Sequence, residues 1–597
     1  MSEAVSEAGP VVWHLGPRSA VLAEQLAAAL GQAQIGGPAT SELVAAFRDG
    51  RPVVAIAAAG IVVRLLAPWL GDKRDEPPVV VVDEAGRFVV PLLGGHRGAN
   101  DLARRLAAAI GAEAVVTTAG DGRFGLALDA PPPGFRLAHP EAAKPFMAAL
   151  LEGAGCRLDD PADLAGWLHA SRLPFAEAGP LIIEVTHERR APAEDRLTFH
   201  PATLALGVGC ERNADPEELA DLVTTTLAEA GLAAEAVACV ASVSLKAAEP
   251  AIHAVAERLA VPARFFERTR LAEETPRLAT PSAVVEAEIG IPGVAEAAAL
   301  AAAGPASRLL VAKRKSRRCT VALALAAQPI DPATVGRPRG RLTVLGFGPG
   351  DPATRTPAAS RALEQADLVI GYGLYLDLVA DLAARAEQRR YPLGEERDRC
   401  IAAIAEAASG RNVALVCSGD PGIYAMAALV MEILDKTPDE AAARIRVTVL
   451  PGVSALQVAA ARSGAPLGHD FAVISLSDLL TPMAVIEQRL AAAAAGDFAL
   501  ALYNPVSQRR RTALASAKRL LLDHRPPTTP VVIARNLGRE GETVVTTTLC
   551  DLEVDQVDML SIVLIGASQS RSFARLDGTT CTYTPRGYSV RAPAEPA

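Results

Sequence analysis

The sequence predicts a multidomain α/β protein whose sheets are mainly parallel. Short runs rich in Val, Ile and Leu alternate with longer Ala-, Leu- and Arg-rich segments of helical period along the 597 residues. Such alternation is typical of α/β layers, and continuous apolar strands are typical of parallel strands covered by helices on both faces. Half of the residues are hydrophobic and 21% are charged, as in globular proteins. The length allows roughly three to five domains.

Ten apolar runs are the predicted strands. They cover residues 52–60, 77–86, 181–187, 203–209, 342–348, 412–419, 445–452, 498–504, 529–536 and 561–568. Apolar residues with helical spacing predict helices at 99–111, 215–231, 356–367 and 511–524. Asp215 and Thr356 are the expected N-caps of two of them, and Pro357 follows Thr356 at the first helical position.

Two Pro-rich stretches divide the chain. Residues 130–134 read APPPG, and residues 326–341 are rich in Pro, Gly and Arg, which is typical of a linker between domains. We therefore expect a first α/β domain at 1–135, a middle region at 136–198, a module at 199–328, a linker at 329–341 and a C-terminal part at 342–590 with two lobes that meet near residue 451.

The composition argues against several classes of protein. The net charge of −9 is unfavourable for a surface that binds nucleic acid. The longest apolar run, residues 53–63, is too short to span a bilayer, and no signal peptide is recognisable, so no membrane partner is expected. The eight cysteines form no CxxC pair, which predicts reduced thiols in a cytoplasmic protein and no metal site.

The segment LTVLGFGPGDP at residues 342–352 is an apolar strand that ends in a Gly- and Pro-rich turn. A Rossmann fingerprint needs a third glycine at position 351, which is Asp, and Pro349 lacks the amide that would face a phosphate. No Gly-Lys-Ser/Thr sequence follows, which excludes a P-loop. We expect a turn that lets backbone approach another group closely, and a plain strand-to-helix turn is the alternative.

Four further motifs follow this turn in order. They are VCSGDPGIYAMA at 416–427, VLPGVSALQVAAARSGAPLGHDFAVISLSD at 449–478, LALYNPVSQRRR at 500–511 and VVIARNLGREGETVVTTTL at 531–549. Together the five motifs resemble the tetrapyrrole methylases of vitamin B12 synthesis, and in detail the methylases that act at C17 of precorrin-3B or cobalt-factor III. The resemblance covers residues 341–590 and implies a two-lobed, non-Rossmann α/β fold, usually in a homodimer.

The same resemblance implies that S-adenosylmethionine lies in the cleft between the two lobes. The residues that match the cofactor-binding motifs are Pro349, Gly419, Asp420, Gly422, Ile423, Tyr424, Ser454, Ala455, Leu502, Tyr503, Asn504, Asn536, Leu537, Thr546, Thr547 and Thr548. For Asp420 two interpretations stay open, because its carboxylate suits hydrogen bonds from the cofactor and also the N-cap of the next helix.

A precorrin or cobalt-precorrin is the implied tetrapyrrole substrate, with Pro349 and Gly350 in the trough where it docks. Its carboxylates suit arginine side chains, so the candidates are Arg509, Arg510, Arg511, Arg535 and Arg539, although each of them equally suits a solvated surface. Ring contraction, the second half of the implied reaction, needs proton transfers. His469 is the expected catalytic residue, with Asp470 and Asp478 nearby, and a solvated loop histidine is the alternative.

The front of the chain has its own set of motifs. PLLGGHRGANDLARRLAAAIGAEAVVTT at 91–118, TLALGVGCERNADPEELADLV at 203–223 and ASVSLKAAEP at 241–250 occur in this order. The order resembles the cobalamin-biosynthesis protein that opens the lactone of cobalt-precorrin-5A, over residues 10–328. One glycine fewer precedes Ala99 and Asn100 than in that pattern, so the distance from His96 to Asn100 is shortened.

The resemblance makes His96 the expected general base for water, with Asn100 or Lys246 polarising the lactone carbonyl. Glu249, three residues after Lys246, would share a helix face with it. Cys210 suits a packed position or a substrate wall. The alternatives are a front half that binds tetrapyrrole carboxylates without catalysis, and a methylase half that acts at another position of the ring or in siroheme synthesis.

Overall fold

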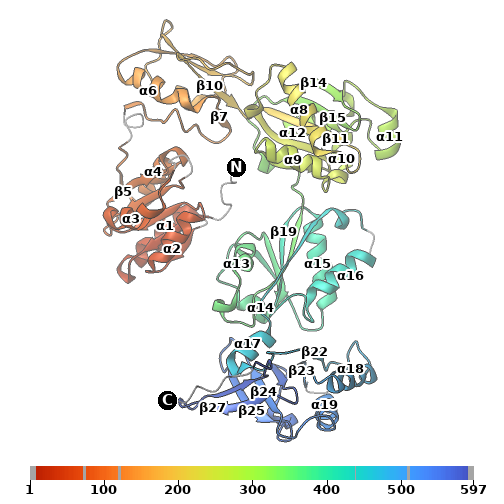
Figure 1. The fold of residues 1–597 in the computed structure, drawn as a ribbon. Coiled ribbons are helices and arrows are strands. Elements are labelled where there is room, and N and C mark those ends of the chain that lie inside the picture. Colours follow the sequence, from red (N-terminus) through yellow and green to blue (C-terminus); the bar gives the residue numbers. More distant parts are fainter. Residues whose placement is uncertain are drawn as a thin grey trace, which may run out of the picture. The chain divides into compact units, whose positions relative to one another are not determined.

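The computed structural model describes residues 9–31, 33–71, 76–117, 123–436, 439–506 and 511–588, except for the side chain of His96. The chain divides into two compact units at Arg339 and Gly340 (Figure 1). Among the described residues, no helix combines the length and the apolar character that a bilayer crossing requires. All eight cysteines are unpaired.

The first unit begins with a six-stranded sheet of order β2-β1-β3-β4-β5-β6. Its centre is parallel and consists of β1 (Val11–His14), β3 (Val53–Ile56) and β4 (Val79–Val82). The apolar runs predicted β3 and β4, which are fully buried, but not β1. Helices α1 (Ala20–Leu30) and α4 (Ala99–Ile110) cover one face, and α2 (Thr40–Arg48) and α3 (Ala59–Leu66) cover the other. The strand predicted at 52–60 is therefore too long, because α3 begins at Ala59.

A four-stranded sheet of order β7-β10-β9-β8 follows. Its strands are β7 (Phe135–Leu137), β8 (Cys156–Asp159), β9 (Leu181–Val185) and β10 (Arg196–Pro201). Helix α6 (Ala143–Leu151) packs on one face, where Phe146 and Leu150 meet Ile183, Leu197 and Phe199. Because side chains alternate along a strand, Thr198 and His200 of β10 project from the other face.

The third sheet of this unit has the order β13-β12-β11-β15-β14. The strands β11 (Leu204–Cys210), β12 (Val237–Val243) and β13 (Ala263–Phe266) are parallel, and β14 (Arg308–Lys315) and β15 (Cys319–Leu325) form an antiparallel hairpin beside β11. Helices α8 (Pro216–Glu229) and α9 (Pro250–Arg258) cover one face, and α12 (Ala295–Ala303) covers the other. Asp215 caps α8 through the amide of Glu217, as predicted.

The segment after β15 stays attached to this third sheet. The buried guanidinium of Arg264 on β13 donates to the carbonyl oxygens of Ala333, Val335 and Gly336, at 3.2, 2.6 and 3.2 Å. Phe265 and Arg337 exchange two backbone hydrogen bonds of 2.8 Å. Most of the stretch expected as a linker, residues 329–341, is thus fixed to the first unit by hydrogen bonds.

The second unit consists of two lobes. The first lobe is a five-stranded parallel sheet of order β18-β17-β19-β16-β20, formed by β16 (Arg341–Gly346), β17 (Leu368–Tyr372), β18 (Glu387–Tyr391), β19 (Asn412–Cys417) and β20 (Arg446–Leu450). Helices α15 (Glu396–Ala408) and α16 (Met426–Lys436) cover one face, and α13 (Pro357–Glu364) and α14 (Gly373–Asp377) cover the other (Figure 1). Thr356 caps α13 and Pro357 follows it, as predicted.

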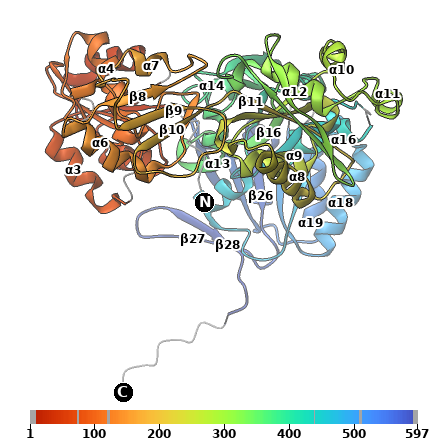
Figure 2. The ribbon, with the colours of Figure 1, turned by 90° about the horizontal axis from the view of Figure 1, so that it is seen from above.

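The second lobe is built on a mixed sheet of order β22-β23-β26-β24-β25. Its strands are β22 (Phe471–Ser475), β23 (Ala499–Tyr503), β24 (Pro530–Arg535), β25 (Thr543–Thr548) and β26 (Ser561–Ile565). Helices α18 (Met483–Ala495) and α19 (Thr512–Leu522) pack side by side on one face, and α17 (Ala455–Ser463) packs on the other (Figures 1 and 2). A small sheet, β21-β28-β27, adjoins it.

Candidate active site

Three strands of the first lobe end in glycines that pack backbone against backbone. Gly346 ends β16, Gly419 follows β19 and Gly452 follows β20. A β-carbon at Gly452 would overlap the carbonyl oxygen of Gly419 and lie 2.7 Å from that of Gly346. Gly348 and Gly419 also exchange backbone hydrogen bonds of 2.8 and 3.4 Å. The turn at 346–350 therefore approaches another backbone closely, as predicted, and its neighbour is the chain's own turn after β19.

Asp420 ties these turns together. Its Oδ1 accepts a hydrogen bond from the amide of Gly422 at 2.8 Å, and its Oδ2 accepts one from the amide of Gly452 at 3.1 Å. Helix α16 begins six residues later, at Met426, so the interpretation of Asp420 as its N-cap is wrong. The carboxylate instead fixes the turns after β19 and β20 relative to one another.

Two tyrosines connect the first lobe to the second. Tyr424 lies after β19, and its hydroxyl donates to the carbonyl oxygen of Val473 on β22 at 2.9 Å. Its ring is 5.6 Å from that of Tyr503, measured between centroids. The Tyr503 hydroxyl in turn accepts a hydrogen bond from the amide of Leu456, at 3.3 Å, and burial raises the pKa of Tyr503. Tyr424 is still 55% exposed as a whole residue, so part of it is open to a ligand.

One apolar cluster brings together four of the predicted cofactor-binding residues from separate segments: Ile423, Ala455, Tyr503 and Leu537. Ser454 and Ala455 stand at the start of α17, where the amide of Ser454 donates to Gln457 Oε1 at 2.8 Å. The cluster shares Val532, Ala534, Ile562 and Leu564 with the core of the second lobe. We call this cluster, with Ile423, Ala455, Tyr503 and Leu537, the wall. It lies on the face of the second lobe's sheet that α17 covers.

Two predicted positions, Leu502 and Thr547, are corrected by the alternation of side chains along strands. Leu502 is fully buried in the cluster under α18 and α19, on the opposite face of the sheet from Tyr503. Thr546 pairs with Val532, which belongs to the wall, but Thr547 pairs with Val531, which belongs to the opposite face. The hydroxyl group of Thr548 donates a hydrogen bond to Asp551 Oδ2 at 2.6 Å. Leu502 and Thr547 therefore present only backbone to the wall.

Backbone strain gathers at the same place. Tyr424, Asn504 and Asn536 each have a φ of 51°, which is uncommon outside glycine. The amide nitrogen Nδ2 of Asn504 donates to Ser475 Oγ at 3.1 Å, and the backbone amide of Asn536 donates to the carbonyl oxygen of Leu560 at 3.2 Å. Strained residues that the surrounding structure holds in place are typical of binding and catalytic sites.

Pro349 and Gly350 contact the loop between β24 and β25 of the second lobe. Arg539 Nε donates to the carbonyl oxygen of Pro349 at 2.8 Å, and its Nη2 donates to Ser418 Oγ at 3.1 Å. The guanidinium also lies 6.0 Å from the ring centre of Tyr375. A β-carbon at Gly350 would lie 2.7 Å from Arg539 Cγ. Arg539 was expected to bind substrate, but these contacts give it the role of joining the lobes, which no local sequence pattern indicates.

The other expected substrate arginines differ in their surroundings. Arg535 lies on the surface and forms an ion pair with Asp558, with 2.6 Å between Nε and Oδ2. Arg511 precedes α19 and pairs with Asp555. Arg509 and Arg510 lie outside the described residues. Each of the three described candidates therefore already has a partner: Asp555 for Arg511, Asp558 for Arg535 and the backbone of Pro349 for Arg539.

His469 lies far from Tyr503 and Asn504, although it was expected to be catalytic. It precedes β22, whereas Tyr503 and Asn504 lie at the opposite end of the parallel neighbour β23. Five residues of strand separate these ends by about 16 Å. The imidazole is 57% exposed, and its Nδ1 accepts a hydrogen bond from the amide of Asp470 at 2.8 Å. The alternative, a solvated loop histidine, describes it better.

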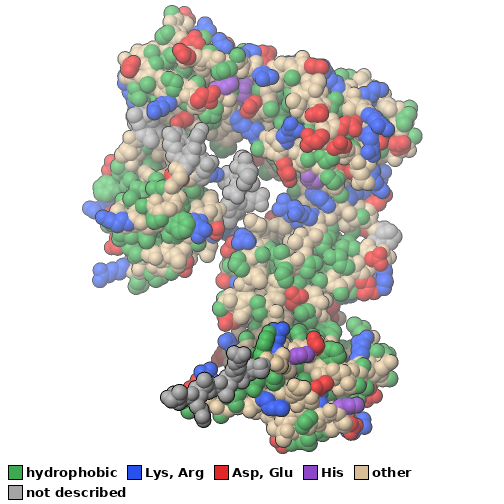
Figure 3. Space-filling model, viewed as in Figure 1, with side chains coloured by type: hydrophobic (Ala, Val, Ile, Leu, Met, Phe, Trp, Pro, Cys, Tyr) green, Lys and Arg blue, Asp and Glu red, His purple; other side chains and the backbone are tan. Residues whose placement is uncertain are grey.

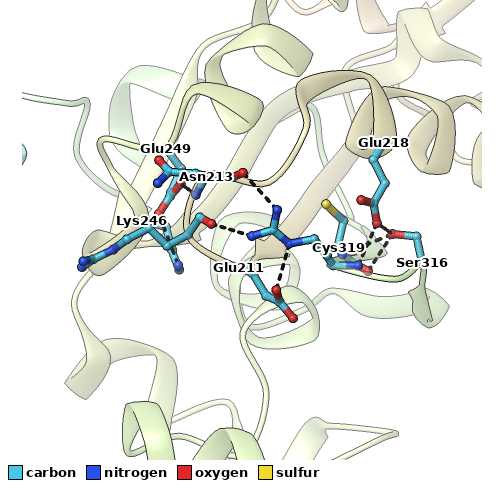
Figure 4. A network of polar contacts seen from close by, with 9 residues as sticks. Glu211, Asn213, Glu218, Lys246, Glu249, Ser316 and Cys319 are labelled. Atoms are coloured by element: carbon cyan, nitrogen blue, oxygen red, sulfur yellow. Dashed lines mark hydrogen bonds and ion pairs between the residues drawn. The ribbon is translucent and has the colours of Figure 1, made fainter.

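In the first unit, Lys246 and Glu249 form the expected pair. Lys246 ends a short 3-10 helix and Glu249 precedes α9, and their side chains meet at 3.3 Å between Nζ and Oε1. Glu249 Oε2 accepts a hydrogen bond from the amide of Asn213 at 2.9 Å (Figure 4). Arg318 extends the network from Glu211 and the carbonyl of Asn213 toward the hairpin that carries Ser316 and Cys319.

Cys210 and His96 complete the predictions for the front half. Cys210 faces Cys319 across the strand pair β11 and β15, and burial raises its pKa to about 12, so it is a packed thiol and no nucleophile. His96 lies in a short 3-10 helix, Gly95–Arg97, and its side chain is outside the described residues. Asn100 is buried in the first turn of α4.

Family models match three parts of the chain. The model of tetrapyrrole (corrin/porphyrin) methylases matches residues 341–553. The models of the cobalamin synthesis G N-terminal region and of the cobalamin synthesis G C-terminus match residues 42–121 and 204–324. The solved structure of the methyltransferase CobJ covers 41% of this chain, at 36% identity and a TM-score of 0.39, and the match includes 100% of that structure's chain.

Curated relatives are similar to part of the chain. The cobalamin biosynthesis protein CobIJ of Mycobacterium tuberculosis is 44% identical over 255 residues, which are 42% of this chain and 48% of the relative. The chain thus spans about half the length of that relative. The probable cobalt-factor III C(17)-methyltransferase of Salmonella typhimurium is 42% identical over 42% of this chain and 100% of its own length. The precorrin-3B C(17)-methyltransferase of a Sinorhizobium species is 41% identical, over 42% of this chain and 98% of its own length.

Both of the last two relatives are matched over nearly their whole length. The segment that matches the methylase family model, residues 341–553, lies in the unit that carries the wall and the glycine turns. The front unit contains both segments that match the cobalamin synthesis G models. Through its second unit, the chain belongs to the tetrapyrrole (corrin/porphyrin) methylases, and it joins this methylase to a cobalamin synthesis G-like region.

Proposed function

We propose that the second unit transfers a methyl group from S-adenosylmethionine to C17 of precorrin-3B, or of its cobalt form, and contracts the ring. The names of the two relatives matched over nearly their whole length support this reaction. The observation that carries it is the apolar wall, because Ile423, Ala455, Tyr503 and Leu537 come from four separate segments and converge beside the glycine turns. A cytoplasmic homodimer belongs to the same proposal, and light scattering tests the dimer.

The residues at the wall fit S-adenosylmethionine. The partly open ring of Tyr424 and the ring of Tyr503 suit a sulfonium cation, because the face of an aromatic ring attracts positive charge. The wall offers apolar contact for adenine, and the strained backbones at Asn504 and Asn536 are held in a fixed conformation at its edge. When bound, this cofactor supplies a methyl group that is already activated.

The task left to the protein is to align two reacting carbons. Proximity and orientation lower a barrier by about 7–11 kcal/mol when the geometry is fixed in advance. Asp420, Tyr424 and Arg539 supply that fixation, because each bonds two segments to one another. The rigid wall also excludes water from one side of the cofactor, which protects the methyl group from hydrolysis.

The test is a reaction of the full-length protein with methyl-labelled S-adenosylmethionine and precorrin-3B, with and without cobalt. The expected product is heavier by one methyl group, and its carbon NMR spectrum places the label on C17 of a contracted ring. A label at another ring position would overturn the C17 proposal in favour of a methylase with a different specificity. A product without label would overturn the methylase activity itself.

A second activity is proposed for the first unit, the hydrolytic opening of the lactone of cobalt-precorrin-5A. The specific observation is the pair of Lys246 and Glu249, both largely buried, within the segment that matches the cobalamin synthesis G C-terminus. We expect Lys246→Met to abolish lactone opening and to leave methyl transfer unchanged, as followed by product mass. Binding of the lactone without opening by the unsubstituted protein would instead show a non-catalytic binding module.

A further inference from the structure

A cavity of about 480 Å³ lies inside the first unit, where the sheet of β7, β10, β9 and β8 meets helices α8 and α9. This is a volume typical of small-molecule sites. One wall comes from residues 138–139, 189–190 and 200, which lie between the two segments that match family models in this unit. Hydrogen bonds such as that from the amide of Arg189 to the carbonyl oxygen of Gly231, at 2.8 Å, hold the two walls together.

The side of the cavity that β10 forms is polar, although it faces another part of the same unit. Leu197 and Phe199 point into the core under α6, so Thr198 and His200 point the other way. His200 is only 2% exposed and lines the cavity. Figure 3 shows histidine side chains gathered over the position of β10 and β7. A buried sheet face that served packing alone would carry apolar side chains at these positions.

One nitrogen of His200 is available to a ligand. Its Nδ1 lies 2.6 Å from the carbonyl oxygen of Thr186, and since a carbonyl only accepts, Nδ1 carries the proton. Nε2 then holds a lone pair in the neutral ring, and it forms no hydrogen bond with any residue that the structure describes. Burial lowers the pKa of His200, with a smaller opposing effect from the negative charges of Glu235 and Glu184.

The charges around the cavity favour an anion. Among the described residues that line it, Arg189, Arg190 and Arg258 carry positive charge and Glu235 carries negative charge. Arg190 is held by Glu184 and Glu188, and Arg258 pairs with Glu217, whereas the guanidinium of Arg189 forms no ion pair within the described residues. Arg136, which pairs with His200 across the strands, His139, His187 and Glu184 are further titratable groups near the imidazole. The floor is apolar, with Val223, Leu227, Leu232, Val255 and Leu259.

We infer that this cavity binds a carboxylate attached to an apolar ring, with Arg189 as the cation and His200 as a proton acceptor that becomes charged when the ligand enters. The carboxylate adds a negative charge beside Nε2, so the imidazole takes up one proton from solution and donates it as a hydrogen bond to the ligand. The apolar floor accommodates the ring. The cavity and the methyl-transfer wall belong to different units of the chain, and this proposal does not depend on methyl transfer.

The test uses the full-length protein and 3-phenylpropionate, a carboxylate on an apolar ring, in calorimetric titrations with buffers of different ionisation enthalpy. We expect uptake of up to one proton per ligand, and an affinity that rises by up to about tenfold per pH unit as the pH falls from the pKa of His200 in the complex to its lower pKa in the free protein. His200→Gln should abolish both effects. Arg189→Met, a surface substitution that keeps the fold, should weaken binding at least fivefold while proton uptake persists. The matched control is His169→Gln, an exposed histidine of the same unit.

An uncharged probe and a tetrapyrrole complete the experiment. The amide 3-phenylpropanamide should bind at least tenfold more weakly than the acid, and equal binding would overturn the proposal. Unchanged proton uptake in His200→Gln, or no heat from 3-phenylpropionate at millimolar concentration, would also overturn it. Displacement of 3-phenylpropionate by uroporphyrin III assigns the site to the carboxylate-bearing edge of a tetrapyrrole, and its failure to displace assigns the site to a free carboxylic acid. Methyl transfer, measured on the same samples, reports separately on the second unit.

Discussion

Arg539 donates a hydrogen bond from Nε to the carbonyl oxygen of Pro349 over 2.8 Å, so a side chain of the second lobe holds the turn that ends the first strand of the first lobe. Its second donor reaches Ser418 beside the Gly419 turn. The guanidinium therefore fixes both glycine turns with respect to the wall, and the reaction's geometry depends on it.

Arg539→Lys should lower kcat for methyl transfer by up to about a hundredfold, because a single ammonium group cannot reproduce the two directed contacts and small misplacements of reacting groups are costly. Steady-state assays with labelled cofactor measure it. Arg535→Lys is the matched control, since that exposed side chain only pairs with Asp558 and should change kcat little. Equal rates for both variants would remove Arg539 from the positioning of the site.

Gly452→Ala should destabilise the second unit by about 1–3 kcal/mol or more, because the added methyl group overlaps the carbonyl oxygen of Gly419. The three tryptophans, Trp13, Trp69 and Trp167, all lie in the first unit, so their fluorescence reports on that unit alone. We expect the circular dichroism transition of the second unit to shift while tryptophan fluorescence stays unchanged. Gly373→Ala, where the nearest atom would be 3.7 Å away, is the control.

Tyr424→Ala should weaken binding of S-adenosylhomocysteine about tenfold, since it removes the aromatic face that borders the wall. Tyr424→Phe keeps the ring and loses only the hydrogen bond to Val473, so its effect on the free energy of unfolding should be about 1 kcal/mol or less. Titration calorimetry of both variants with S-adenosylhomocysteine separates the contribution of the ring to binding from that of the hydroxyl group. A Phe variant as weak as the Ala variant would assign the binding to the hydroxyl and not to the ring.

Stability of the first unit should fall as the pH drops below about 6.5, the ordinary pKa of histidine. Burial lowers the pKa of both His187 and His200 in the folded protein, so the unfolded chain takes up protons first and is favoured at acid pH. Well above that pH, both histidines are neutral in the folded and in the unfolded protein, so they no longer change the free energy of unfolding. Thermal unfolding followed by tryptophan fluorescence should show this slope, and His200→Gln should make it shallower than His169→Gln does.

His469→Ala should retain methyl transfer within about twofold of the unsubstituted protein, because the imidazole is exposed and lies at the opposite strand end from Tyr503 and Asn504. The rate is measured with the same labelled cofactor. A loss of two orders of magnitude would restore His469 to the catalytic role that its sequence motif suggested.

Local signals in the sequence predicted the elements well, because strands, caps and glycine turns depend on neighbours in the chain. The apolar runs mark the buried parallel strands, and Thr356 and Asp215 cap the helices that they precede. Strand ends were less predictable, since the apolar run at 52–60 continues into α3. Apolar residues serve both kinds of element when they are buried.

The candidate site was only partly predictable, for a physical reason. A motif shows which residues are close in sequence, but not which face of a strand each one occupies in the sheet. Leu502 and Thr547 therefore fell on the opposite face from Tyr503 and Thr546. The contact of Arg539 with Pro349 spans 190 residues and leaves no local trace. Likewise, the proximity of His200 to α8 and α9 arises only when separate sheets pack together.

The wall is at once a ligand surface and part of a hydrophobic core, and this sets how the enzyme can be redesigned for bulkier alkyl donors. Leu537 shares its cluster with Val532 and Ile562 of the central strands, so shortening it would open a hole in the lobe's interior. Tyr424 is half open to solvent. Space for an ethyl or allyl donor should therefore be made at Tyr424, where a smaller side chain opens no hole in the lobe's core, at the cost of the hydrogen bond to Val473 and of part of the aromatic contact.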